Sequence, residues 1–198
     1  MAWTEAVEKL WNMLRDHRPS LYPMEEWDDL HDIRISKLPQ EGLDSRALSN
    51  AKAVKAGLHL LNESLEASHK LSQELHTPLG SYWHAIMHRM EGDYGNSKYW
   101  FRQGGAHPVG DALQAAAKAR VQSYAAEAFG SDSLKNRLDK LVSGPSWDPY
   151  LFVDIVEQQV TVVQNEQAEE LLTELQWVEI KLLVQYSFQQ TGGHSLEL

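Results

Sequence analysis

Residues 81–108 read SYWHAIMHRMEGDYGNSKYWFRQGGAHP, and this stretch decides the prediction of the fold. Gly92 is typical of a residue that ends a helix, and Asp93 is typical of a residue that caps the next one. Asn96 follows Asp93 by three residues, as in a variant of the capping box. Pro108 prevents the second helix from continuing. The stretch therefore predicts two short helices joined by a tight turn.

The rest of the chain also has helical rather than alternating periodicity. No turn dipeptide stands between two alternating apolar runs, so no β-hairpin is expected. The length of 198 residues and the 42% hydrophobic content suit one domain with a substantial core. We therefore predict an all-α protein with a single domain that covers residues 1–198.

Four parts can be distinguished within this domain. Residues 1–46 hold a helix capped at Thr4 and a long irregular connection from Leu21 to Ser45. Residues 47–108 form two helical hairpins. Residues 109–190 form C-terminal helices, which we expect at 111–129, 134–141 and 167–189, with one more helix capped at Asp148. Residues 191–198 form a polar tail that we expect to be disordered.

The two hairpins resemble each other and the tetratricopeptide (TPR) pattern. Aligning Asn62 with Gly92 gives an interval of 30 residues, which also matches residues 76–78 with residues 106–108. In the second copy, small residues, a Gly-Asp-Tyr turn and a closing proline occupy the TPR positions. Solenoids usually need about three repeats for stability, and only two are visible here. We therefore expect a compact helical domain that contains two TPR-like hairpins.

Composition excludes several classes of partner. The formal net charge is -10, the isoelectric point is near 5.3 and no basic stripe is present, so a nucleic-acid partner is not expected. No apolar run approaches the roughly 20 residues that span a bilayer, and the first residues do not form a signal peptide. The chain has no cysteine, which fits a reducing compartment. We expect a soluble, cytoplasmic protein without a membrane partner.

The first helix of the second hairpin carries three candidate metal ligands. His84, His88 and Glu91 are spaced i, i+4 and i+7, so they fall within a stripe roughly 60° wide on one helix face. Two imidazoles one turn apart can share a divalent ion, and a carboxylate would complete a first shell with an open position for water. Without a metal, His88 and Glu91 could act as a general base and its orienting group, which makes them the candidate catalytic residues.

Other residues near this stripe are candidates for ligand binding. Arg89 suits an anion or a carboxylate partner, and His69 and Gln73 lie one turn apart on the preceding helix, where they could reach the same site. Aromatic side chains could form the walls of a pocket. The candidate ligand-binding residues are His69, Gln73, Trp83, Arg89, Asp93, Asn96 and Tyr99. For Asp93 and Asn96, helix capping is the competing interpretation.

The same segment resembles an uncharacterised family of soluble microbial proteins. The shared pattern is Trp-His-x-Ile-x-His-Arg-x-Glu-x-Asp-x-x-Asn-x-x-Tyr-Trp-Phe-Arg, which this chain matches from Trp83 to Arg102. An upstream Ser-His-x-x-x-Gln is matched by Ser68, His69 and Gln73. The resemblance implies that these residues act as a set, but it implies no activity, substrate or cofactor.

Three functional hypotheses remain open at this point. In the first, a polar His/Glu/Arg pocket in the 81–108 hairpin binds a small ligand or a divalent metal. In the second, the protein is a non-enzymatic TPR-like module that holds a peptide in an open groove lined by Tyr82, Ile86 and Arg89. In the third, the polar hairpin is a hydrogen-bonded core with a structural role only. Oligomeric state cannot be derived from the pattern.

Overall fold

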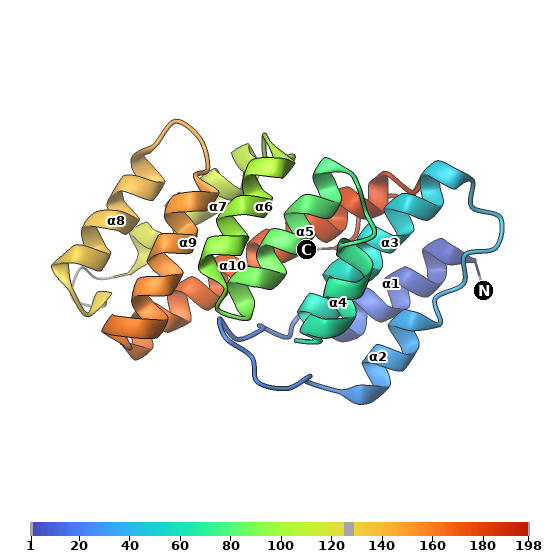
Figure 1. Cartoon of the computed structure of the whole chain (residues 1–198), viewed down its shortest axis with the longest axis horizontal. Coiled ribbons are helices and arrows are strands. Elements are labelled where there is room, and N and C mark those ends of the chain that lie inside the picture. The colour runs from blue at the N-terminus through green and yellow to red at the C-terminus, as the bar shows by residue number, and fades with distance from the viewer. Residues whose placement is uncertain (1, 125–128, 198) are drawn as a thin grey trace.

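The computed structural model describes residues 2–124 and 129–197, and these residues form helices without a β-strand (Figure 1). Most helices lie side by side in a row, and α10 crosses behind them from the α7 end to the α3 end. Among the described residues, no helix combines the length and the apolar composition needed to cross a bilayer. In chain order the elements are α1 (Trp3–Leu14), α2 (Asp29–Ser36), α3 (Ser45–Leu61), α4 (Leu65–Ser72), α5 (Pro78–Met90), α6 (Tyr94–Gly104), α7 (Gly110–Ser123), α8 (Asp132–Ser143), α9 (Pro149–Gln158), the π-helical turn η2 (Gln159–Val163) and α10 (Glu166–Gln189).

Helix α5 is the centre of the molecule. Its neighbours include α3, α4 and α6, and every residue from Gly80 to Met90 is buried. The Thr77 hydroxyl accepts a hydrogen bond from Gly80 N–H at 3.1 Å, and Pro78 stands in the first turn, where its missing N–H is not needed. Because α5 is enclosed on all sides, polar side chains on it must find partners inside the protein.

The predicted turn between the two helices of the second hairpin is confirmed. Gly92 has a φ of 86°, in the left-handed region that ends many helices. The Asp93 carboxylate then accepts a hydrogen bond from Asn96 N–H at 3.0 Å and caps α6. A methyl group at Gly92 would also lie 2.8 Å from the Tyr22 ring. The absence of a side chain at Gly92 therefore allows the segment before α2 to pack against this turn.

The same turn joins α3 and α4, at an interval one residue shorter than the predicted 30. Ser64 N–H donates to His59 O at 2.9 Å, and Asp93 N–H donates to His88 O at 2.9 Å. These matching bonds lie 29 residues apart. The equivalence therefore pairs His59 with His88, and each of these imidazoles has a carboxylate on its Nδ1 atom.

The N-terminal part differs from the prediction in two ways. Helix α1 begins at Trp3 with Ala2 as its N-cap residue, so Thr4 is not the cap. The connection expected to be irregular contains α2, which Asp28 caps through Leu30 N–H at 2.7 Å. This helix buries only His31 and Ile35, which leaves little apolar periodicity to detect.

Differences also occur towards the C-terminus. Helix α7 ends at Ser123 instead of residue 129, and the expected helical position Ala128 lies outside the described residues. Residues 191–197 are packed against the domain rather than free. Leu196 is buried, and Trp11 Nε1 donates to Glu197 O at 2.7 Å.

Candidate functional site

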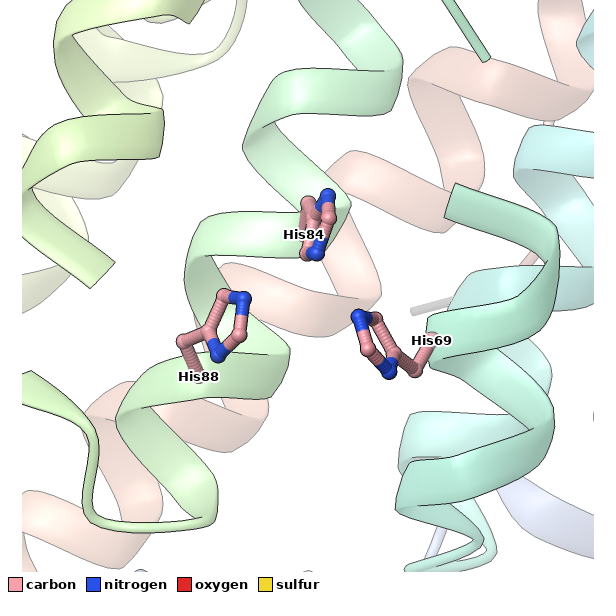
Figure 2. A group of neighbouring side chains, drawn as sticks. All are labelled: His69, His84 and His88. Atoms are coloured by element: carbon pink, nitrogen blue, oxygen red, sulfur yellow. The ribbon is translucent and has the colours of Figure 1, made fainter. Parts of the chain in front are cut away.

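Three imidazoles come together between α4 and α5. His84 and His88 lie one turn apart on α5, and His69 reaches them from α4 (Figure 2). One potential ligand nitrogen from each ring lies within 4.8 Å of those of the other two. The link of residues 73–77 folds α4 back against α5, which brings His69 to the two α5 histidines. This group of three, named the histidine cluster below, is the strongest candidate site among the described residues.

The cluster lies just beneath the surface. His84 and His88 are 4% and 5% exposed, whereas His69 is half-buried. The rings of His84 and His88 are nearly parallel, with centroids 4.7 Å apart. On its other side His84 stacks on Trp100 of α6 at 4.1 Å. Trp100 therefore covers one face of the His84 imidazole.

Hydrogen bonds fix the orientation of His88. Its Nδ1 lies 2.5 Å from Glu91 Oε1, and its Nε2 lies 3.2 Å from Asn96 Nδ2. Because a carboxylate can only accept, the Nδ1 atom carries the hydrogen and donates it to Glu91. The Nε2 lone pair is then directed to the side where Asn96 lies. A metal ligand imidazole commonly has this arrangement, with a carboxylate behind it.

The surroundings of His84 favour its neutral form. Burial, with smaller contributions from the neighbouring His88 and His69, lowers the pKa of His84 to about 4. His84 is therefore uncharged near pH 7, and its buried Nδ1 atom has no hydrogen-bond partner among the residues that the structure describes. A neutral imidazole with an unused nitrogen can bind a metal ion without first losing a proton.

The structure groups the ligands differently from the expected set of His84, His88 and Glu91. Glu91 lies behind His88 and contacts its Nδ1 atom, and His69 occupies the third position. Glu91 also lies close to Asp93, but both carboxylates are exposed. Helical spacing alone could not show this, because the third imidazole comes from another helix.

Of the two partners that the sequence suggested for Arg89, an anion or a carboxylate, the structure shows a carboxylate, and it lies on α10 rather than in the histidine cluster. The Nη2 atom of Arg89 donates to Glu179 Oε2 of α10 at 2.5 Å, and both side chains are fully buried. Burial raises the pKa of Glu179, but Arg89 and His107 outweigh burial and hold this pKa below its usual value. The guanidinium also lies over the Phe152 ring at 4.6 Å. Arg89 thus joins α5 to the centre of α10.

The other predicted ligand-binding residues do not converge on the cluster. Trp83 is fully buried in the core, where its ring lies against Gly57. Gln73 is exposed at the end of α4, and Tyr99 is half-exposed with its ring edge towards Trp100. Asp93 caps α6. Of the predicted set, His69, His84, His88, Glu91 and Asn96 form the contacts of the site.

Four cavities of the described part of the chain are lined by residues other than those predicted for the site. The close approach of the three rings suits an ion, which needs a radius of only about 2 Å to its ligands. No family model, curated protein or solved structure matches the chain.

Proposed function

We propose that the protein binds one divalent transition metal ion, with Zn²⁺ as the best fit, through His69, His84 and His88. The observation that carries this proposal is the convergence of three ligand nitrogens within 4.8 Å. On a tetrahedral zinc ion with bonds of about 2.0–2.1 Å, neighbouring nitrogens lie roughly 3.3 Å apart. Each imidazole therefore needs to move by only about 1 Å to share an ion.

The surrounding residues support a site with an open position. Three protein nitrogens leave the fourth position of a tetrahedral ion for water, as in catalytic zinc sites. Glu91 would hold His88 with Nε2 towards the ion, and the Asn96 amide, which lies 3.2 Å from that nitrogen and donates to it, would move aside for the ion. Zinc lowers the pKa of its water to about 7, which would supply a hydroxide nucleophile near neutral pH.

Metal titration of the full chain tests the proposal. Protein treated with a chelator and dialysed is titrated with ZnCl₂ by calorimetry, and one ion per chain is expected. His69→Gln and His84→Gln each remove one ligand and are expected to weaken binding by roughly 100-fold or more. His76→Gln is the matched control, because His76 is exposed in the link between α4 and α5.

Co²⁺ gives a second readout. A tetrahedral site with nitrogen ligands gives Co²⁺ visible absorption bands that the hydrated ion lacks. The near-parallel rings of His84 and His88 must also tilt for both lone pairs to reach one ion, which would change the stacking on Trp100 and its fluorescence. Absence of binding for both Zn²⁺ and Co²⁺, or wild-type affinity in His69→Gln and His84→Gln, overturns the proposal.

We also propose that α3–α4 and α5–α6 are divergent copies of a TPR-like hairpin. The repeated turn bonds at an interval of 29 residues support this. An interaction module would require an open groove at Tyr82, Ile86 and Arg89, but all three side chains are buried. The contacts therefore favour an ion over a peptide. A cytoplasmic location remains part of the proposal, supported by the cysteine-free composition.

A further inference from the structure

A second candidate site lies between α7 and α10, away from the histidine cluster. A cavity of about 360 Å³ is bordered there by two basic side chains, Arg120 of α7 and Lys181 of α10, and by no acidic one. Its remaining walls are apolar or aromatic: Ala112, Ala116, Trp177, Val178 and Leu182. In a chain of net charge -10, two cations bordering one apolar cavity need a physical explanation.

Lys181 is the unusual residue of this cavity. Its side chain is 8% exposed, and its ammonium lies 3.4 Å from the centre of the Trp177 ring. Among the described residues it has neither a hydrogen-bond acceptor nor a carboxylate within ion-pair distance. The ammonium nitrogen keeps some contact with solvent, and the face of Trp177 replaces part of the hydration that it loses.

The guanidinium of Arg120 uses only one of its three nitrogens in a hydrogen bond to the described residues. Glu174 accepts a hydrogen bond from its Nε atom at 2.9 Å, and the terminal nitrogens make no hydrogen bond within the described part of the chain. The guanidinium therefore keeps donors for another acceptor in the cavity. A planar guanidinium and an ammonium on one wall match the two oxygens of a carboxylate.

The charges around Lys181 are mainly positive. Burial lowers its pKa to about 8, and Arg120, Arg15 and Arg18 act in the same direction, whereas Asp16 opposes them. A bound anion would reverse this effect, because it favours the charged form of the lysine.

We propose that this cavity binds a small organic carboxylate with an apolar body. The carboxylate would lie between Lys181 and Arg120, and the apolar body would pack on the small side chains of α7 and on Leu182. The volume is at the lower end of the range for small-molecule sites, roughly 300–1,000 Å³, so a ligand of about the size of benzoate fits. This site shares no residue with the histidine cluster and does not depend on a metal there.

Calorimetry with sodium benzoate and sodium hexanoate tests the site. Saturable binding in the millimolar range or tighter is expected for at least one of them, and Lys181→Met is expected to weaken it at least tenfold. Lys118→Met is the matched control, because it removes the same charge from an exposed position of α7. Circular dichroism and thermal unfolding verify that Lys181→Met is folded, and Lys181→Arg, which keeps the charge, is expected to retain part of the affinity.

Two further measurements separate this site from general attraction of anions. Inorganic phosphate has the charge but no apolar body, and it is expected to bind at least tenfold more weakly. Affinity is expected to fall by up to tenfold per pH unit above about pH 8, where free Lys181 loses its proton. The other charged groups near Lys181 are Arg120, Arg15, Arg18, Asp16 and Glu174, and burial raises the pKa of nearby Tyr124 away from this range.

The calorimetric results can either support or overturn the proposed carboxylate site. Binding that is lost in Lys181→Met, kept in Lys118→Met and weakened above pH 8 supports the site. Absence of saturable binding for both carboxylates, wild-type affinity in Lys181→Met, or equal affinity for phosphate overturns the proposal.

Discussion

Removing the charge of Glu179 should destabilise the protein more than any surface substitution. Glu179→Gln keeps the size of the side chain but leaves the guanidinium of Arg89 fully buried without a counter-ion. Two of its nitrogens, Nε and Nη1, already lack a hydrogen-bond partner, so the site has little remaining compensation. Breaking a buried ion pair on one side costs about 3–5 kcal/mol. We therefore expect a loss of this size in the free energy of unfolding.

Urea denaturation followed by circular dichroism at pH 7.5 measures this loss. With an m-value of about 2 kcal/mol/M, the midpoint should fall by about 1.5–2.5 M. Replacing both partners, as in Arg89→Met with Glu179→Leu, should cost much less than the sum of the single changes, because no buried charge remains. The control Asp139→Asn breaks the exposed pair with Lys135 and should cost about 0.5 kcal/mol or less.

The reasoning is refuted if Glu179→Gln costs less than about 1 kcal/mol or if the double variant costs the sum of the single changes. The pH dependence of the free energy of unfolding gives a further test. The pKa of Glu179 is lowered by folding, so its contribution to stability is complete above its unfolded pKa, near 4.5, and is lost as the pH falls through the folded value. Glu179→Gln should therefore show a weaker loss of stability in acid than the wild type.

Three further predictions concern α3, α4 and α5. In Gly57→Ala the new methyl group would lie 2.5 Å from the Trp83 ring, so the free energy of unfolding should fall by about 1–3 kcal/mol in urea denaturation. An unchanged midpoint would show that the core rearranges to accommodate the methyl group. Glu91→Gln should weaken Zn²⁺ binding by about 10–100-fold, as measured in competition with a chelator. The control Glu66→Gln, at an exposed position, should leave the affinity unchanged. Equal Zn²⁺ affinities of Glu91→Gln and the wild type would contradict the role of Glu91 in orienting His88. Folding lowers the pKa of His84 from 6.5 to about 4, so the contribution of its neutral form to stability is complete above pH 6.5 and falls as the pH drops towards 4. An NMR titration of the His84 ring measures this pKa, and a value near 6.5 would contradict the buried arrangement.

Local signals in the sequence predicted much of the fold. The glycine and aspartate of the 92–93 turn, and Asp148 with Pro149 before α9, are local signals whose effect depends only on nearby backbone groups, and both are found as expected. Helix α2 was missed because a short helix that buries two side chains leaves a weak periodicity. The π-helical turn η2 after α9 was also missed, since it has the same apolar composition as the helix that it extends.

The candidate site was predicted less completely than the fold. The position of His84 and His88 on one face follows from their spacing, and stacking of hairpins suggested that His69 is near. The partner of Arg89 could not be predicted, because Glu179 follows it by 90 residues and the contact depends on the packing of α10 across the row of helices. Lys181 was not noticed either, since nothing in its local sequence indicates burial without a partner.

The packing of residues 191–197 against α1 affects when the domain can fold during synthesis. Trp3 Nε1 donates to Thr191 Oγ1 at 2.9 Å, and Trp11 Nε1 donates to Glu197 O, so both indoles of the first helix bond to residues that follow them by 188 and 186 positions in the chain. On the ribosome α1 must therefore wait, with its apolar side uncovered, until nearly all of these residues have emerged. Chaperones that shield nascent apolar helices would have most effect on this chain during that interval.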